Sequence, residues 1–371
     1  MRAALVHYWL LNQRGGEAVL EALCELLPEA DIFTLFYDPA RVSPKIRRHT
    51  IRASFLNPFR RYYRSLLPLM PIALEQFDLR GYDLVVSSES GPAKGVLPAA
   101  TARHVCYCHT PMRYLWDLYP DYLREWTPAW KRPFLTPVSS YLRLWDFATA
   151  ARVDDFIANS ENVKRRIRRC YRRDAQVIYP PVAVERFYWN APEDYFLIVG
   201  ELVPYKRFDI AVRVLRLRKA RLRIVGDGPE YRNLKSLAAG SAEFCGRVSD
   251  AELRELYARC RALILPGEED FGITAVEALA SGKPVIALGR GGAVEIVPAA
   301  EPLGGVFFST PDDQALARAL DQFTVCEPTI QSSALQAWAA RFSRAEFLRK
   351  MRGVLLRHDG AAPEESGSYQ R

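Results

Sequence analysis

The feature that most restricts the fold of this chain is a series of short apolar runs, each followed by glycine, serine, proline or histidine. Continuous apolar runs are typical of parallel strands, because helices cover both faces of such a sheet. Segments with apolar residues at helical spacing separate the runs, so the pattern predicts an α/β fold. In the first half of the chain the expected strands are Ala3–Trp9, Asp31–Phe36, Asp83–Ser87, Arg103–Cys108 and Asp155–Ala158.

A double proline in the segment Tyr179-Pro180-Pro181 interrupts this pattern. Proline fixes the direction of the chain and cannot continue a helix, so we expect a boundary between two lobes there. A single hydrophobic core rarely exceeds roughly 250–300 residues, whereas this chain has 371. We therefore predict two Rossmann-like lobes, residues 1–181 and 182–335. The expected strands of the second lobe are Tyr195–Val199, Arg221–Val225, Ala262–Leu265 and Pro284–Ala287.

The remaining C-terminal residues divide into two parts. Apolar residues at helical spacing predict one amphipathic helix over residues 336–358, and the polar composition of residues 359–371 predicts a disordered tail. No apolar stretch reaches the roughly 18–20 residues that span a bilayer, and the first residues lack the cleavage site of a signal peptide. We therefore expect a cytoplasmic protein.

The net charge of +8 is concentrated in two segments. Residues 41–64 contain no acid, and residues 164–173 are rich in arginine on one expected helix. Such segments attract polyanions, among them anionic lipid, diphosphate-linked molecules and nucleic acid. Residues 55–70 mix aromatic, basic and aliphatic side chains, which fits a membrane interface or, equally, an internal pair of helices. For residues 164–173 a solvated helix face is slightly favoured over membrane contact.

The strongest functional signal follows the expected strand Ala262–Leu265. It reads Pro-Gly-Glu-Glu-Asp-Phe-Gly-Ile-Thr-Ala-Val-Glu, with Glu269 in a loop and Glu277 in the first turn of an expected helix. Gly272 would let the backbone approach a ligand, and the first amides of the helix would bind an anion. The two carboxylates would then accept hydrogen bonds from hydroxyls on either side of a phosphate. Taken alone, the acids are better explained as first-turn acids that stabilise a helix dipole.

Three further loops follow expected strands. Lys206 and Arg207 would offer cationic groups to a leaving diphosphate, and a solvated charge pair is the alternative. Gly226-Asp227-Gly228 predicts a tight turn. Gly15 and Gly16 precede an expected helix whose bare amides could meet a phosphate. None of the three loops is specific by itself.

Together these loops resemble family 4 of the retaining glycosyltransferases with the GT-B fold, and the resemblance covers most of the chain. Glu269 and Glu277 match the family's two glutamates separated by seven residues, with Phe271 and Gly272 between them. The resemblance implies an α/β protein with two Rossmann-like lobes that face each other across a cleft. It also implies that the C-terminal helix crosses back to the N-terminal lobe (N-lobe), and that the C-terminal lobe (C-lobe) binds a nucleotide-diphosphate sugar.

The resemblance assigns roles to residues of both lobes. Lys206 and Arg207 would clamp the diphosphate beside Gly200, while Glu269 would hold the donor sugar and Glu277 the ribose. His109 of the N-lobe would contact the sugar near the reacting carbon, although without the resemblance it is better explained as a satisfied histidine at a strand end. The other residues implied to bind the donor are Gly16, Gly246, Val248, Phe271, Gly272 and Ile273, and Gly291, Gly292 and Glu295 fit a second glycine pair before a glutamate.

The segment His-Thr-Pro-Met-Arg-Tyr-Leu-Trp-Asp-Leu-Tyr after residue 108 is similar to mannosyltransferases that build bacterial O-antigen and related polysaccharides from GDP-mannose. This likeness implies α-mannosyl transfer, with retention, to a polyprenyl-diphosphate-linked saccharide at the inner face of the cell membrane. Arg113 and Tyr114 would line the acceptor side. A UDP-sugar donor is the alternative. Because members of the family need no divalent metal and the sequence lacks an Asp-x-Asp triad after a nucleotide-binding strand, we expect no metal or other cofactor.

Three other protein classes fit part of the sequence. Sugar-nucleotide epimerases share the GT-B fold but do not usually carry the paired-glutamate signature. An NAD-dependent dehydrogenase would need a G-x-G-x-x-G motif after the first strand, which is missing. A nucleic-acid-binding protein would explain the basic segments but not acids beside a phosphate site, so we expect no nucleic acid partner. The odd number of cysteines predicts reduced thiols, and Cys106 and Cys108 lack the second ligand cluster of a zinc site.

Overall fold

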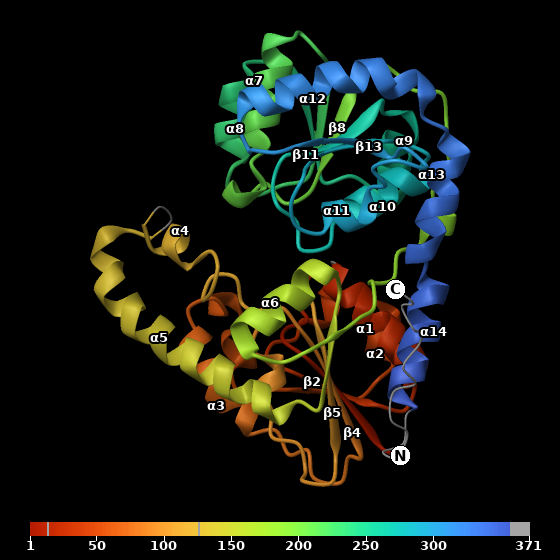
Figure 1. Cartoon of the computed structure of the whole chain (residues 1–371). Coiled ribbons are helices and arrows are strands. Elements are labelled where there is room, and N and C mark those ends of the chain that lie inside the picture. Colours follow the sequence, from red (N-terminus) through yellow and green to blue (C-terminus); the bar gives the residue numbers. More distant parts are fainter. Residues whose placement is uncertain (13–14, 125–126, 357–371) are drawn as a thin grey trace, which may run out of the picture.

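A computed structural model of the chain describes residues 1–12, 15–124 and 127–356 and shows two α/β lobes, one above the other in Figure 1. Each lobe is built around its own parallel sheet, flanked by helices on both faces. The two Rossmann-like lobes predicted from the apolar runs are therefore confirmed. Among the described residues, no helix has the length and apolarity needed to cross a bilayer.

The N-lobe sheet has the strand order β3-β2-β1-β4-β5-β6-β7. Its edge strands β3 and β7 were not predicted, because with three and two residues they are too short to show periodicity. The strands are β1 (Ala3–His7), β2 (Asp31–Thr34), β3 (Ile51–Ala53), β4 (Leu84–Glu89), β5 (Arg103–Cys108), β6 (Asp155–Ala158) and β7 (Gln176–Val177). The helices are α1 (Gly15–Leu26), α2 (Pro44–Arg47), α3 (Met70–Glu75), α4 (Tyr119–Arg124), α5 (Arg132–Thr149) and α6 (Glu161–Tyr171).

The C-lobe sheet has the order β10-β9-β8-β11-β12-β13. In both sheets the order reverses next to the first strand, and ligands of such sheets bind beyond the carboxyl ends of the strands at this reversal. The strands are β8 (Phe196–Val199), β9 (Leu222–Val225), β10 (Ala242–Gly246), β11 (Ala262–Leu265), β12 (Val285–Leu288) and β13 (Gly305–Phe308). The helices are α7 (Phe208–Leu217), α8 (Tyr231–Ala238), α9 (Asp250–Arg259), α10 (Ile273–Ala280), α11 (Ala293–Ile296), α12 (Asp313–Cys326) and α13 (Ser332–Ala339).

The chain passes between the lobes twice, at neighbouring points. Ile178 is buried in the N-lobe core and Val182 in the C-lobe core, so the first passage lies between them. The return passage runs beside it, because the backbone N–H of Val182 donates to the carbonyl of Phe342 and that of Arg344 donates to the carbonyl of Val182. These two passages of the chain form the hinge between the lobes.

The prediction of a single helix over residues 336–358 is wrong, because the structure divides this segment into two helices at the hinge. Helix α13 ends at Ala339, and α14 (Arg344–Leu355) begins after Ser343. Ser343 is extended, and its hydroxyl accepts a hydrogen bond from the backbone N–H of Glu346, which makes it the N-cap of a new helix. As expected from the resemblance, the chain crosses back, and α14 packs against the N-lobe core through Phe347 and neighbouring apolar residues (Figure 1). The predicted tail at 359–371 lies outside the described residues.

The internal helix pair considered for residues 55–70 is also corrected. The segment forms two 3-10 helices, Asn57–Tyr62 and Leu67–Leu69, before α3 begins. Pro58 and Pro68 occupy the first turns of these short helices. A proline tolerates a first turn but not a helix interior, which explains why longer helices do not form here.

Candidate active site

The loop between β11 and α10 carries Glu269 and faces the N-lobe, and α10 itself carries Glu277. Gly272 has a φ of +105°, a conformation that other residues rarely adopt, and it turns the chain directly into α10. Phe271 is buried behind the loop, where its ring lies 5.6 Å from that of Tyr179 and 5.9 Å from that of Phe342. Both partners belong to the hinge, so the loop is anchored where the chain passes between the lobes.

Glycines of three neighbouring loops pack tightly around Lys206. A Cβ atom on Gly226 would lie 1.9 Å from the carbonyl oxygen of Gly200, and one on Gly267 would lie 2.6 Å from Cα of Lys206. The packing places Nζ of Lys206 3.1 Å from a carboxylate oxygen of Glu269. The structure thus brings three predicted site residues, Gly200, Lys206 and Glu269, together at the carboxyl ends of β8 and β11.

Arg207 takes a different direction from Lys206. Its backbone is left-handed, with a φ of +51°, and its guanidinium lies 3.2 Å from the carboxylate of Asp209 in the first turn of α7. The side chain is 40% exposed. The structure does not join Arg207 to the Lys206–Glu269 pair, so its part in a diphosphate clamp stays a prediction.

Glu277 lies past the first turn of α10, in which it was expected, because the helix begins at Ile273. The hydroxyl of Tyr257 on α9 donates a hydrogen bond of 2.8 Å to its carboxylate. Burial raises the pKa of Glu277 to about 7. Val248, in the loop predicted to bind the base, packs in the same apolar cluster as Tyr257. Gly246 ends β10, where its carbonyl accepts a hydrogen bond of 2.8 Å from the backbone N–H of Gly226. The residues predicted to bind base and ribose therefore lie on adjacent elements.

The N-lobe contributes residues that follow β1 and β5. A Cβ atom on Gly16 would lie 3.1 Å from the hydroxyl of Tyr8 and 3.7 Å from Nε2 of His109, so Gly16 packs against both side chains. A Cβ atom on Gly15 would lie 2.5 Å from Cδ1 of Ile273, the first residue of α10. The predicted donor residues Gly16, His109 and Ile273 therefore gather where the N-lobe meets the start of α10.

The imidazole of His109 is held in a neutral form. Burial, together with the nearby His7, lowers the pKa of His109 to about 3. Its Nε2 lies 3.0 Å from the hydroxyl of Ser88, and its backbone N–H donates a hydrogen bond of 2.7 Å to the carbonyl of Glu89. A neutral imidazole in this position can exchange a hydrogen bond with a hydroxyl without gaining charge.

An ionic network joins the two lobes on either side of Glu269. Arg166 of α6 lies 2.7 Å from the carboxylate of Glu268 and also contacts that of Asp270. Arg113, after β5, lies 3.4 Å from Asp270. We call these four charged side chains the interlobe latch. Because Glu268 and Asp270 flank Glu269 in the sequence, the latch holds the loop that presents Glu269.

The interlobe latch changes two interpretations made from the sequence. The basic segment 164–173 is not a membrane or solvent face throughout, since the side chain of Arg166 is only 12% exposed, although Arg168 and Arg169 face solvent. Arg113 was predicted to line the acceptor side together with Tyr114. Arg113 contacts the C-lobe, and the hydroxyl of Tyr114 lies 2.9 Å from the sulfur of Met112, so an acceptor contact by either stays a prediction.

Glu295, which fitted a donor-contacting pattern, makes a contact between the lobes. Its carboxylate accepts hydrogen bonds of 2.7 Å from the backbone N–H groups of both Glu161 and Asn162, the first residues of α6. A carboxylate there interacts favourably with the helix dipole. Gly291 and Gly292 pack against the backbone of residues 269–271 and so support the loop that carries Glu269.

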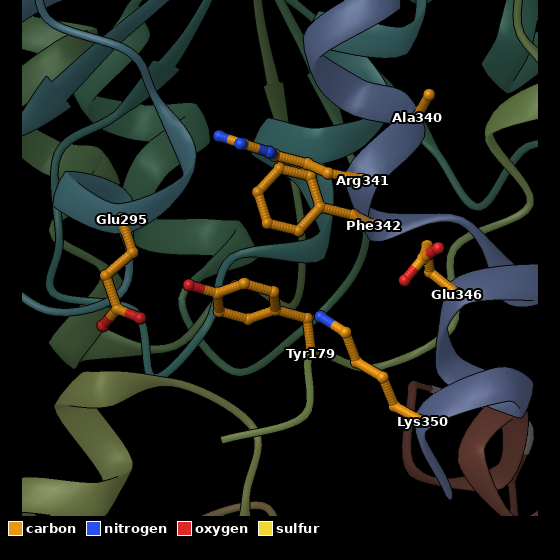
Figure 2. Close-up of a pocket in the computed structure, with 7 residues that line it drawn as sticks. All are labelled: Tyr179, Glu295, Ala340, Arg341, Phe342, Glu346 and Lys350. Atoms are coloured by element: carbon orange, nitrogen blue, oxygen red, sulfur yellow. The ribbon is translucent and has the colours of Figure 1, made fainter. Parts of the chain in front are cut away.

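A hollow of about 540 Å³ lies at the hinge, close to Glu295. Figure 2 shows the hydroxyl of Tyr179 pointing toward the Glu295 side, with Phe342 next to the tyrosine ring. Arg341, together with Glu346 and Lys350 of α14, completes the charged part of the lining. Because its walls come from the hinge, from α11 and from α14, the size of this hollow depends on how the lobes are placed.

Sequence reasoning missed several residues of the site. Glu268 and Asp270 stand in the motif itself, yet only their neighbour Glu269 was given a role. Arg166 was seen as one member of a basic run, and Tyr257 was not singled out. A signal for the interlobe latch was present, because three successive acids in a loop require cations nearby when they are partly buried.

Cys106 and Cys108 are buried free thiols on β5, as predicted. In the part of the chain that the structure describes, no cluster of three or more His, Cys, Asp or Glu side chains is arranged to hold a metal ion.

Comparison with known proteins agrees with this architecture. The O-antigen chain mannosyltransferase RfbU of Salmonella typhimurium is 29% identical over 202 residues, which are 49% of this chain and 55% of that protein. A GDP-mannose-dependent alpha-mannosyltransferase of Mycobacterium tuberculosis is 40% identical over 100 residues, or 27% of this chain and 26% of that protein. The chain thus matches about a quarter to just over half of the length of these relatives.

The structure of Anabaena HepE in complex with UDP-glucose superimposes with a TM-score of 0.69, covering 96% of this chain and 99% of that chain at 18% identity. This likeness establishes the GT-B fold. Two family models also match the chain in succession, Glycosyltransferase Family 4 over residues 14–186 and Glycosyl transferases group 1 over residues 184–336. Since the two models meet at the hinge and account for both lobes, the chain belongs to the family 4 glycosyltransferases of GT-B fold.

Proposed function

We propose that the protein transfers a mannosyl group from GDP-mannose, with retention, to a lipid-linked saccharide. The observation that carries the proposal is the Lys206–Glu269 pair, 3.1 Å apart, at the strand-order reversal of the C-lobe and beside the N-terminus of α10. A cation and bare helix amides suit a diphosphate, and a carboxylate suits sugar hydroxyls. A nucleotide sugar presents these groups in that order.

Each half of the site would have its own task. Lys206 and the first amides of α10 would stabilise the charge that develops on the departing diphosphate. Glu269 would accept hydrogen bonds from the sugar, and Glu277 from the ribose. His109, neutral and opposite α10, would bind a sugar hydroxyl near the reacting carbon. The diphosphate itself would help to remove the acceptor proton on the same face, which retains the configuration and needs no metal.

The choice of mannose rests on two likenesses. The similar proteins from Salmonella and Mycobacterium are named as mannosyltransferases, and the mycobacterial protein is named as dependent on GDP-mannose. The segment that begins at His109 is similar to the same subgroup. A UDP-sugar is the second candidate donor, because the HepE structure of the same fold holds UDP-glucose.

The acceptor we propose is a saccharide on a polyprenyl diphosphate, which would bring the protein to the inner face of the cell membrane as a peripheral protein. The name of the Salmonella protein, an O-antigen chain mannosyltransferase, supports a polysaccharide product. The excess of basic residues supports an anionic surface as a partner.

A thermal-shift panel of GDP, UDP, ADP and their sugar conjugates, with EDTA present, tests the donor. A ligand that binds the native state raises the unfolding midpoint by mass action. A shift that is selective for GDP or GDP-mannose is the expected result, and a shift by UDP alone would replace the donor while keeping the reaction class. No shift with any nucleotide would contradict the proposal and would favour an epimerase or a nucleic-acid-binding protein.

A further inference from the structure

Helices α4 and α5 form an arm that extends from the side of the N-lobe (Figure 1). The C-terminal part of α5 is its root, where Leu142 and Asp146 are buried. Asp146 contacts the buried Lys94 and accepts hydrogen bonds of 2.7 Å from Trp116 and 3.0 Å from Tyr171. Because every one of these partners belongs to the body of the N-lobe, the arm is firmly attached at its root.

The outer side of the arm is apolar and exposed. The exposed fractions are 70% for Trp130, 71% for Phe134, 49% for Tyr141 and 68% for Leu144. Within α5 the last three recur seven and three residues apart, so they share one face of the helix. An exposed apolar face of this kind usually marks an interaction site.

The charges on the arm select the partner. After α4, which carries Asp121 and Arg124, residues 127–145 contain three basic side chains and no acid. Lys131 lies over the ring of Trp130, 5.0 Å from its centre, so a cation stands directly beside the exposed indole. Aromatic residues interleaved with lysine and arginine suit the headgroup layer of an anionic bilayer. A second copy docked through residues 127–145 would bring like charges together, which disfavours self-association through this face.

Other exposed aromatic side chains lie on the 3-10 helices that pack beside the root of the arm. Phe59 and Tyr62 of the first 3-10 helix are 58% and 69% exposed. Leu67, at the start of the second, packs with Leu142 at the root of α5. Arg64, between them, lies near Tyr122 of α4 and near the carboxylate of Glu201 in the C-lobe. The root of the arm and these 3-10 helices therefore lie close to the place where the two lobes meet.

We propose that the outer face of the arm, with Trp130 just before α5 and Phe134 and Leu144 on α5, docks the protein onto a membrane surface that contains anionic lipid. The inference deepens the proposed function, on which it rests for its purpose: a lipid-linked acceptor could then reach the junction of the lobes from the adjoining bilayer. The structure favours this arm over residues 164–173, where Arg166 is occupied by the interlobe latch.

Vesicle sedimentation of the full chain tests the proposal. The probes are vesicles of equimolar phosphatidylglycerol and phosphatidylcholine, and vesicles of phosphatidylcholine alone. We expect binding to the anionic vesicles that weakens about tenfold in the double variant Trp130→Ser with Phe134→Ser. The matched control is Leu217→Ser with Val325→Ser, which alters apolar residues on α7 and α12 of the C-lobe that are 79% and 80% exposed. This control should bind like the unchanged protein.

The outcomes separate the possible failures. No binding of the unchanged protein to anionic vesicles overturns the proposal, and so does an equal loss in the control. If light scattering shows a dimer that the arm variant dissolves, the face belongs to a second copy and the proposal is wrong. Should the double variant lose its cooperative melting transition, Leu144→Glu replaces it. The assay contains no donor, so the proposed function is judged separately, by the thermal shift with GDP-mannose.

Discussion

The two lobes build their halves of the site by different means. In the C-lobe, Gly200, Gly226 and Gly267 bring the backbone of three loops into contact and leave Lys206 and Glu269 in one arrangement. In the N-lobe, the side chains of Tyr8 and His109 form the surface, and a Cβ atom on Gly16 would need only a small shift of the Tyr8 hydroxyl, 3.1 Å away. A backbone-built site tolerates little change in shape, whereas a side-chain-built site tolerates change in shape but not in chemistry.

The largest effect should follow the loss of the cation in the C-lobe half. Lys206→Ala removes the group 3.1 Å from Glu269, and we expect turnover to fall about 10²–10³-fold, the usual cost of one donor that stabilises a developing charge. Arg207→Ala is the matched control, because the Arg207 guanidinium lies against Asp209 and should matter about tenfold or less. Steady-state kinetics with a soluble acceptor measures both. Equal losses of turnover in the two variants would support the predicted diphosphate clamp made by both Lys206 and Arg207.

Next in size is the stability cost of filling the glycine packing. Gly226→Ala would place a methyl group 1.9 Å from the Gly200 carbonyl at a φ of +133°, and we expect a loss of roughly 2–4 kcal/mol in the free energy of unfolding. Gly16→Ala meets its first atom at 3.1 Å and should cost about 1 kcal/mol or less. Urea unfolding compares the two, with Gly353→Ala, which meets nothing within 4 Å, as the control. If Gly16→Ala proved the more damaging, the contrast between the lobes would be lost.

A smaller effect is expected at the interlobe latch, where the two halves depend on each other. Arg166→Gln releases Glu268 and Asp270, and we expect kcat/KM for the donor to fall about tenfold, or roughly 1.4 kcal/mol, mainly through KM. Arg168→Gln, on the exposed side of the same helix, should leave the kinetics unchanged. Partial recovery in the exchanged pair Arg166→Glu with Glu268→Arg would show that the contact acts between the lobes, and failure of both predictions would remove the latch from the site.

How much could be predicted from the sequence follows the same contrast. A backbone that requires glycine at fixed positions produces a recognisable sequence motif. The sequence therefore predicted the C-lobe loops that hold Lys206, Glu269, Gly272 and Glu277. The interlobe contacts of Arg166 and Glu295 were not, because pairing across 102 to 134 residues leaves no local pattern. The arm at α5 was also missed, since two prolines near its start obscure the helical periodicity.

The smallest predicted effect concerns Glu277, whose pKa burial raises to about 7. An unfolded glutamate has a pKa of about 4.3, so the folded protein binds more protons than the unfolded chain between these values. The stabilising contribution of protonated Glu277 is therefore complete below about pH 4 and is lost as the pH rises through about 7. Glu277→Gln, which cannot ionise, should match the unchanged protein near pH 4 and be more stable than it at pH 8 in urea unfolding without nucleotide.

Glu255→Gln on α9 serves as the control for this last prediction, because hydrogen bonds from Tyr188 and Arg259 lower the pKa of Glu255. A lowered pKa gives the opposite sign, since its stabilising contribution exists above the unfolded pKa and is lost in acid. The control should therefore gain no stability at pH 8. If Glu277→Gln also gained none, the Glu277 carboxylate would be in contact with water, and the C-lobe half of the site would be less tightly closed than its glycine packing indicates.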